Sequence, residues 1–201
     1  MRPPPVISES IMTELVTKTR YAYRGRLLKL RVARVRLQNG LETTREIVEH
    51  PGAVAVIPLL DDGRILFTRQ YRIAARKQLL EIPAGTLEAR ETALTCARRE
   101  LVEETGHAAR RIRKLFSCYL APGYSTEKIH FFLGTSLVRR RARQAQDEMI
   151  TVRAMNLRQG LRAIEAGRIQ DAKTICGLYY LATHGTWRRR KARRRVGPLT
   201  G

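Results

Sequence analysis

The N-terminal part of the chain alternates hydrophobic and polar positions in short runs. Leu28, Leu30 and Val32 are separated by basic residues, and an Asn-Gly pair at 39–40 follows them. A period of two places successive side chains on opposite faces of a strand, and Asn-Gly is typical of a tight hairpin turn. Residues 21–49 are therefore predicted to form a small antiparallel sheet.

A second block, residues 53–72, is also rich in strand-forming residues. Residues 53–59 are a continuous apolar run, which predicts a strand that is buried on both faces and central in its sheet. The turn-forming sequence Asp-Asp-Gly at 61–63 and a further strand-like run at 65–72 follow. Two strands joined by a short turn are typical of a β-hairpin, and we expect one here.

The period changes to that of a helix over residues 92–105. Leu94, Ala97 and Leu101 recur at spacings of three and four, and Gly106 stands where a C-terminal cap belongs. Strands are predicted further along at 115–120, 129–133 and 149–155, and helices at 157–166 and 171–182, the last with Ile175, Leu178 and Tyr179 on its apolar side. This mixture of strands and helices predicts an α/β or α+β sandwich.

The charge of the chain is strongly positive. Lys and Arg number 39 against 18 Asp and Glu, a formal net charge of +21, which attracts phosphates of any kind. Basic residues concentrate at 110–114, at 139–143 and in segment 186–201, where seven occur without an acid. A block of like charges repels itself, so we expect 186–201 to be a disordered tail. The charge alone does not separate a nucleotide ligand from a nucleic acid.

The three cysteines, Cys96, Cys118 and Cys176, lie far apart and include no Cys-x-x-Cys pair. Their odd number and spacing argue against a disulfide framework and a zinc site, and favour a reducing compartment. No apolar stretch approaches the roughly 18 residues of a membrane span, and the N-terminus lacks the apolar region of a signal peptide. We therefore expect a cytoplasmic protein without a membrane segment.

Three carboxylates share one face of the predicted helix. At about 100° per residue, Glu100, Glu103 and Glu104 lie together beside the apolar stripe. Such carboxylates repel one another, by about 3 kcal/mol per pair in a half-buried cleft, so a partner cation is expected. Oxygen ligands without His or Cys favour Mg²⁺, or Mn²⁺, over zinc, and Mg²⁺ typically bridges protein carboxylates to substrate phosphates. The alternative is a solvated acidic helix face.

The same helix belongs to a longer spaced pattern. Residues 85–106 read Gly-x5-Glu-x7-Arg-Glu-apolar-x-Glu-Glu-x-Gly. This is the pattern of the Nudix box, and the chain resembles the Nudix hydrolase superfamily. The resemblance implies an α/β/α sandwich with a mixed sheet, preceded by a small N-terminal antiparallel sheet. His107 departs from the family pattern, which usually has an apolar residue there, and this affects local packing rather than chemistry.

Shorter motifs outside the box resemble the ADP-ribose pyrophosphatase branch of this superfamily. They are Gln-Tyr-Arg at 70–72, Glu-Ile-Pro-Ala-Gly at 81–85, Ala-Pro-Gly at 121–123 with Glu127, and Asp-Glu at 147–148. The resemblance implies Mg²⁺-dependent cleavage of the diphosphate of ADP-ribose to AMP and ribose 5-phosphate. GDP-mannose, other nucleoside diphosphate sugars, dinucleotides and RNA ends stay open as substrates.

The resemblance also implies a set of metal ligands. Glu100 and Glu104, with the backbone carbonyl of Ala84, are expected to hold one Mg²⁺, and Glu103 is expected to help hold a second. Arg99, together with Glu91, is expected to orient these carboxylates.

Further residues match positions that the branch uses for catalysis and substrate binding. Glu148, or its neighbour Asp147, is expected to activate the attacking water. Arg72 resembles the residue that contacts the diphosphate, a role suited to the planar donor fork of arginine. Glu127 resembles a substrate-loop residue that steers metal or ribose, and Glu49 falls where the branch approaches the nucleotide.

The N-terminal element, residues 1–48, resembles a sheet that members of the branch exchange across a two-fold dimer. A homodimer is therefore expected, in which Tyr21 or Tyr23 stacks on adenine. Residues 49–185 are expected to form the hydrolase domain, ahead of the basic tail.

A nucleic-acid-binding or regulatory protein built on the same fold is the alternative function. The basic surplus would give sequence-independent, salt-sensitive affinity for nucleic acid. Trp187 is the only aromatic residue of the tail, however, so base stacking there is limited. Glu100, Glu103 and Glu104 favour the enzyme, because a purely binding relative has no need of a metal cluster.

Overall fold

The computed structural model describes residues 13–140 and 149–185. The contacts among them form two compact units. The first comprises the described parts of Met1–Gly52 together with Ala121–Glu127, and the second those of Ala53–Leu120 and Lys128–Gly201.

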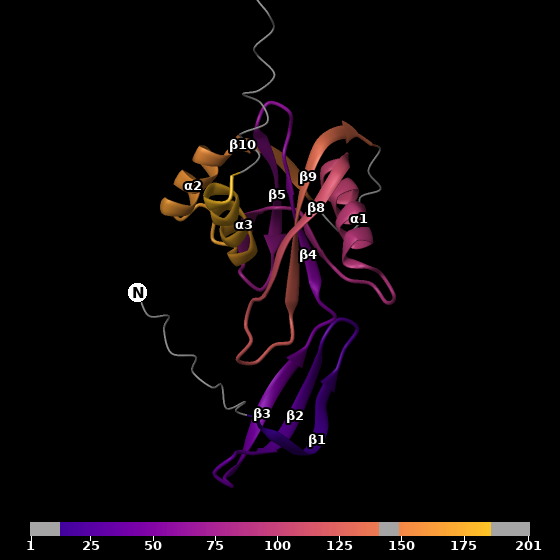
Figure 1. Ribbon diagram of the computed structural model, residues 1–201, viewed down its shortest axis with the longest axis vertical. Coiled ribbons are helices and arrows are strands. Elements are labelled where there is room, and N and C mark those ends of the chain that lie inside the picture. Colours follow the sequence, from indigo (N-terminus) through magenta and orange to yellow (C-terminus); the bar gives the residue numbers. More distant parts are fainter. Residues whose placement is uncertain (1–12, 141–148, 186–201) are drawn as a thin grey trace, which may run out of the picture. The chain divides into compact units, whose positions relative to one another are not determined.

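The first unit is built on a three-stranded antiparallel sheet of order β1-β2-β3 (Figure 1). Its strands are β1 (Leu15–Arg24), β2 (Lys29–Arg36) and β3 (Glu42–Glu49). The tight turn after β2 closes with a hydrogen bond from the Gly40 N–H to the Leu37 carbonyl at 3.0 Å. The antiparallel sheet predicted for residues 21–49 is confirmed, and its first strand begins six residues earlier, at Leu15.

The second unit contains a mixed sheet of order β7-β4-β9-β8. In it, β4 (Ala53–Pro58) pairs antiparallel with β7 (Ala84–Thr86) and parallel with β9 (Lys128–Arg139), and β8 (His107–Tyr119) pairs antiparallel with β9. An antiparallel sheet of order β10-β5-β6 joins β10 (Thr151–Asn156), β5 (Arg64–Arg72) and β6 (Lys77–Glu81).

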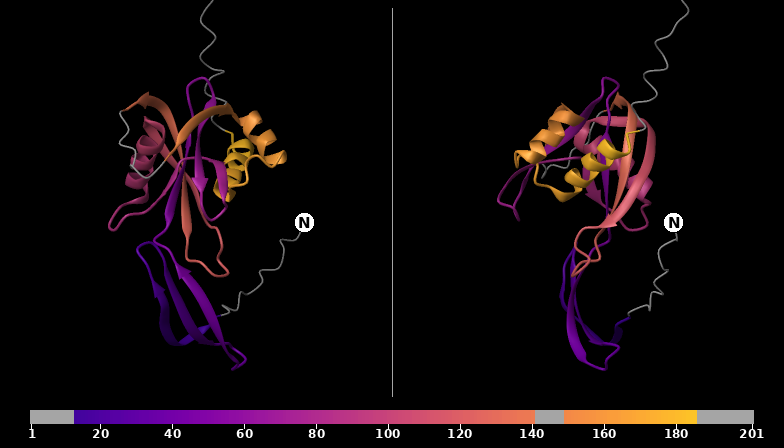
Figure 2. Two further views of the ribbon diagram at one scale, coloured as in Figure 1. Left: turned by 180° about the vertical axis from the view of Figure 1, so that it is seen from behind. Right: turned by 60° about the vertical axis from the view of Figure 1, so that its left-hand side comes forward.

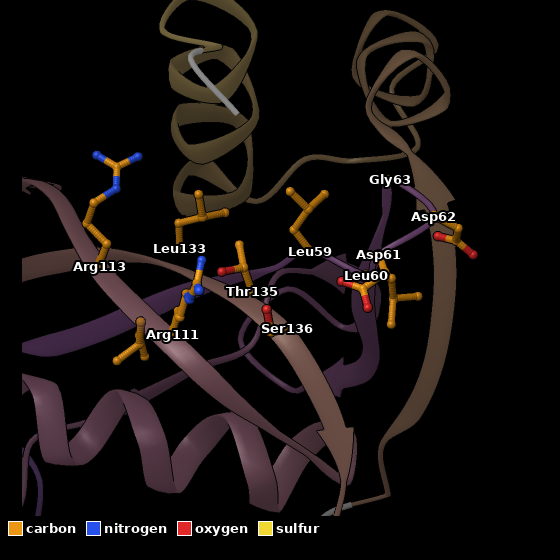
Figure 3. Close-up of a pocket in the computed structure, with 11 residues that line it drawn as sticks. Leu59, Leu60, Asp61, Asp62, Gly63, Arg111, Arg113, Leu133, Thr135 and Ser136 are labelled. Carbon is orange, nitrogen blue, oxygen red and sulfur yellow. The ribbon is translucent and has the colours of Figure 1, made fainter. Parts of the chain in front are cut away.

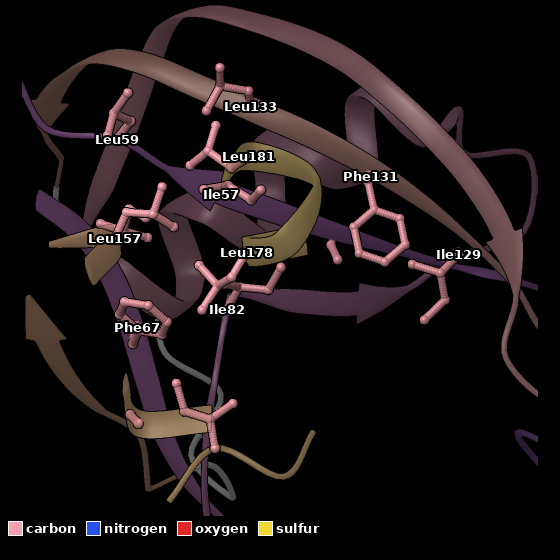
Figure 4. Packing of buried hydrophobic residues seen from close by; sticks show 14 of the residues in the cluster. Ile57, Leu59, Phe67, Ile82, Ile129, Phe131, Leu133, Leu157, Leu178 and Leu181 are labelled. Atoms are coloured by element: carbon pink, nitrogen blue, oxygen red, sulfur yellow. The ribbon is translucent and has the colours of Figure 1, made fainter. Parts of the chain in front are cut away.

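Two hydrophobic cores lie on opposite faces of the mixed sheet because β4 is apolar at every position. Ala53, Ala55 and Ile57 pack on one face with residues of α2 (Leu157–Glu165) and α3 (Ala172–Thr183), as Figure 4 shows in part. Val54 and Val56 pack on the other face with α1 (Ala93–Thr105). Figures 1 and 2 accordingly show α1 on one side of the sheet and α2 with α3 on the other. The α/β/α sandwich with a mixed sheet is confirmed.

The hairpin predicted for residues 53–72 is wrong, although its turn is present. Gly63 closes the turn with a φ of 88° and donates to the Leu60 carbonyl at 2.9 Å. Only an isolated bridge between Leu59 and Ile65 joins the two segments, and β5 belongs to the other sheet. The reason is that β7 and β9 already occupy both edges of β4, which leaves no edge for β5.

The helix predicted for residues 92–105 is confirmed together with its ends. Thr92 caps the N-terminus by accepting a bond from the Thr95 N–H at 3.2 Å. Gly106 ends the helix in the left-handed region, with a φ of 66°, and donates to the Val102 carbonyl at 2.9 Å. The helical segment of α1 and both of its ends are thus determined by the local sequence.

The apolar side predicted for α3 is partly wrong. Leu178 is fully buried, whereas Tyr179 is 46% exposed. Its neighbour Tyr180 instead packs on Phe116, with ring centroids 4.6 Å apart. The pairing of β8 with β9 runs from His107 opposite Arg139 to Tyr119 opposite Lys128, so both strands extend well beyond the apolar segments that predicted them.

Candidate active site

The acidic face of α1 lies against β7. A Cβ placed on Gly85 would stand 1.8 Å from Glu100 Oε1, so the absence of a side chain there is what admits the Glu100 carboxylate. Glu104, which is 5% exposed, accepts a hydrogen bond from the Ala84 N–H at 3.2 Å. The structure therefore brings together Ala84, Glu100 and Glu104, three of the residues expected to hold metal.

Arg99 lies among three carboxylates of the same segment. Its Nε and Nη2 each donate to one oxygen of Glu91 at 3.0 Å, in a bidentate pair. Its Nη1 donates to Glu100 at 2.7 Å and to Glu103 at 3.0 Å. The guanidinium thus fixes the direction of Glu100 and Glu103 and ties the loop before α1 to the helix.

The electrostatics of this cluster follow from those bonds. The hydrogen bonds from Arg99 lower the pKa of Glu91 to about 2, and the same carboxylates raise the pKa of Arg99. Burial, together with the charges of Glu91 and Glu100, raises the pKa of the Cys96 thiol to about 12. The thiol is therefore neutral, and the negative charge of the cluster resides on its carboxylates.

The donor set fits a hard divalent cation. Three carboxylates surround one guanidinium, and Glu104 adds a buried fourth on the same helix, so the cluster carries excess negative charge. All of these donors are oxygens, which Mg²⁺ and Mn²⁺ prefer. Within residues 13–140 and 149–185, no three His, Cys, Asp or Glu side chains converge on one point, and Glu100 and Glu103 face Arg99 instead.

Arg72 belongs to a second network, which the sequence did not reveal. Its Nε and Nη2 donate to the two oxygens of Glu81, each at 2.9 Å, and Glu81 is 2% exposed. Lys173 Nζ also bonds Glu81 and donates to Asp171 at 2.8 Å. Burial raises the pKa of Glu81, but the bonds to Arg72 and Lys173 outweigh it, so the net pKa is lowered. The charge of Glu104 contributes to the raised pKa of Arg72, which couples the two networks.

The signal for Glu81 was present in the sequence as one acid between two apolar pairs, directly after Leu79 and Leu80 and directly before Ile82 and Pro83. Lys173 lies 92 residues further along the chain, and nothing in its local sequence connects it with Glu81.

Glu49 and Glu127 lie in the first unit. Glu49 accepts hydrogen bonds from Arg31 Nε at 2.6 Å and from the Tyr21 hydroxyl at 3.1 Å. The Glu127 N–H donates to Ser125 Oγ at 3.1 Å. Tyr21 in turn carries the Arg24 guanidinium 3.7 Å from its ring centroid. Tyr21 is thus already engaged on its ring face and at its hydroxyl.

The expected base, Glu148, and its neighbour Asp147 lie outside the described residues. The cysteines Cys96, Cys118 and Cys176 form no disulfide and are free thiols. None of the helices within residues 13–140 and 149–185 combines the length and apolar character needed to cross a lipid bilayer.

The family model of the NUDIX domain matches residues 49–177. The chain belongs to the Nudix family. It is therefore a hydrolase, and Nudix hydrolases generally use divalent metal ions.

Several relatives resemble this chain over about two thirds or more of its length. The ADP-ribose pyrophosphatase of Bacillus subtilis (strain 168) is 38% identical over 79% of this chain and 87% of its own. That of Mycobacterium tuberculosis is 36% identical over 80% of this chain and 78% of its own. The GDP-mannose pyrophosphatase of Escherichia coli O139:H28 is 38% identical over 66% of this chain and 73% of its own.

A solved structure supports the fold of this Nudix protein. The crystal structure of an ADP compounds hydrolase superposes with a TM-score of 0.77 at 20% identity, covering 94% of this chain and 100% of that one. At this identity the match shows the shared fold.

The bond between Arg99 and Glu91 predicts a pH-dependent stability. Because the Glu91 pKa falls from its ordinary 4.5 to about 2 on folding, its contribution is complete above pH 4.5 and is lost as the pH falls toward 2. Glu91→Gln should lower the free energy of unfolding by roughly 1–3 kcal/mol at neutral pH and flatten its decline between about pH 4.5 and 3. Urea unfolding followed by circular dichroism at several pH values measures both.

The matched control is Glu88→Gln, an exposed acid three residues earlier. It should leave the pH profile unchanged. Parallel profiles for the Glu91 variant and the parent chain would contradict the assignment.

Proposed function

We propose that this Nudix hydrolase cleaves the diphosphate of ADP-ribose and releases AMP and ribose 5-phosphate. The observation that carries the proposal is the carboxylate cluster of α1, which Gly85 and Arg99 hold against β7. The names of the B. subtilis and M. tuberculosis relatives support ADP-ribose as the substrate.

We propose Mg²⁺ as the cofactor, with Mn²⁺ as a substitute. Glu100, Glu104 and the carbonyl of Ala84 would hold one ion, and Glu103 would help hold a second. When bound, a divalent ion neutralises charge on the diphosphate oxygens and makes a water more acidic. Arg99 positions Glu100 and Glu103 through its Nη1, so its part in the reaction is to fix the ligands before substrate arrives.

Arg72 is the proposed diphosphate contact. Its Nε and Nη2 hold the buried Glu81, which fixes the plane of the guanidinium. The other edge, which carries Nη1, is then the one available to phosphate oxygens, and 40% of the side chain is exposed. Glu148, or Asp147, would accept the proton of the attacking water.

GDP-mannose is the second candidate substrate, because the E. coli GDP-mannose pyrophosphatase is as similar in identity as the B. subtilis relative. Both substrates present a diphosphate between two sugars, so the same cluster serves either reaction. The contacts proposed for the nucleotide, Glu49 and Glu127, belong to the first unit. The proposed cellular location is the cytoplasm, on the basis of the free thiols.

The test of this function is a hydrolysis panel with Mg²⁺, covering ADP-ribose, GDP-mannose and a dinucleoside polyphosphate, with products identified by mass. We expect AMP and ribose 5-phosphate from ADP-ribose at the highest kcat/KM. Glu104→Gln should lower turnover by about a hundredfold or more while the Ala84 N–H keeps an amide oxygen as acceptor.

Glu165→Gln, at the exposed end of α2, is the control and should leave turnover unchanged. Inactivity of the parent chain on every substrate, or near-normal turnover of the Glu104 variant, would refute the proposal.

Gly85 gives a second, independent test. Gly85→Ala should displace the Glu100 carboxylate, since the new Cβ would meet it at 1.8 Å, and turnover should fall by roughly tenfold or more. The fold should persist, because the group that must move is the flexible end of a side chain. In a double-mutant cycle with Glu100→Gln, we expect little further loss on adding Gly85→Ala. Additive losses would show that Gly85 acts through another group.

The proposed homodimer rests on the first unit, whose strand β1 exposes several large apolar side chains. Leu15 is 62%, Val16 49% and Tyr23 61% exposed, and a second copy of the chain would cover such residues. Light scattering should give twice the 23.0 kDa of one chain. Leu15→Asp should shift the mass toward one chain, whereas Leu94→Asp, at a 43% exposed position of α1, should not. A parent mass of one chain would exclude the dimer.

A further inference from the structure

Four arginines line a hollow of about 430 Å³ in the second unit. Arg98 comes from α1, Arg110 from β8 and Arg139 from the last position of β9, and Arg140 directly follows that strand. The remaining wall is small and apolar and consists of Ala108, Ala109 and Val138.

The fold brings together arginines that are separate in the sequence. The pairing of β8 with β9 sets His107 opposite Arg139 and Ala108 opposite Val138. The Arg140 N–H then donates to the Gly106 carbonyl at 2.9 Å, which fastens the end of β9 to the turn after α1. Arg110, Arg139 and Arg140 therefore line one hollow with Arg98, and the main chain fixes the separation of the two strands that carry them.

The charges in this hollow are unbalanced. All four arginine side chains belong to exposed residues, and none forms an ion pair or a side-chain hydrogen bond with any group in residues 13–140 and 149–185. Elsewhere on the surface, by contrast, Arg36 and Arg45 each bind a glutamate. Like charges held together without a counter-charge repel one another, so an anion that enters the hollow relieves the repulsion.

A second, larger hollow of about 610 Å³ is lined by both basic and acidic side chains (Figure 3). Arg111 and Arg113 line it, but so do Asp61 and Asp62. Asp62 also accepts bonds from Arg64, with Nε at 2.8 Å. Because acids share that hollow, it offers an anion much less than the hollow of the four arginines does.

We propose that the Arg98, Arg110, Arg139 and Arg140 hollow binds an oligophosphate, a compact chain of three or more phosphates. Guanidinium forks match pairs of phosphate oxygens, and several forks in one hollow match several phosphates. Among the described residues that line the hollow there is no aromatic ring, so they offer a nucleobase no platform on which to stack. The ligand is recognised by its phosphate chain, whether inorganic or carried by a nucleoside.

The test uses the full chain and inorganic tripolyphosphate in calorimetry at low salt with EDTA. Without divalent ions the acidic cluster of α1 repels anions, so this measurement is independent of hydrolysis. We expect one equivalent per chain, and an affinity that falls as salt rises. Arg110→Gln with Arg139→Gln should weaken binding at least about tenfold. The matched control, Arg153→Gln with Arg158→Gln, removes the same charge from exposed sites on β10 and α2 and should change it less than about twofold.

Two further arms identify the source of the phosphate chain. ATP should bind within about threefold of tripolyphosphate, which would show that the chain alone is recognised. Absence of tripolyphosphate binding would overturn the proposal. An equal loss of affinity in the two double variants would also overturn it, because it would show that binding depends only on net charge. Hollow-dependent binding of single-stranded RNA that tripolyphosphate does not displace would also overturn it and assign the hollow to nucleic acid.

Discussion

Burying a strand on both faces and both edges requires its backbone donors and acceptors to be paired by neighbouring strands. Every residue of β4 is buried, and β7 and β9 flank it. Its alternating side chains feed the two cores, which in turn hold α1 on one face and α2 with α3 on the other. Since β7 is fixed by its pairing with Ala53 to Ala55, the place where the acids of α1 meet Gly85 is fixed as well.

Helix α1 also separates two opposite electrostatic environments. Successive helix residues point about 100° apart, so Arg98 and Arg99 serve different surfaces although they are adjacent. Arg99 lies among the carboxylates of the proposed metal site, whereas Arg98 lines a hollow of unbalanced positive charge. The net charge of +21 draws anions to the molecule as a whole, and the acidic cluster, which is the proposed metal site, is the local exception.

The sequence predicted best those features that depend on neighbours along the chain. The period, the Thr92 cap and Gly106 determined α1, and the spacing of its glutamates placed them on one face. The sequence failed where the partner is distant. The β5 strand was assigned to β4 because the turn between them is local, while the competing partners, β7 and β9, are not. The ion pair between Glu81 and Lys173 was not predicted, for the same reason. Tyr179 was predicted on the apolar side of α3, where Tyr180 packs instead, because the helical period alone does not distinguish adjacent positions at the edge of an apolar stripe.

Two glycines of the Nudix box are restricted by different physical causes. Gly106 adopts a φ that other residues rarely tolerate, so its identity is determined by its own backbone. Gly85 has no such conformation, and its identity depends on the length and position of the Glu100 side chain. During evolution, Gly106 can be replaced only by residues that accept a left-handed backbone. Position 85, in contrast, can accept a side chain once Glu100 is replaced by a residue with a shorter one. Sequence families should therefore show covariation between positions 85 and 100 in members that have given up the metal-dependent reaction, and none between position 106 and any one partner.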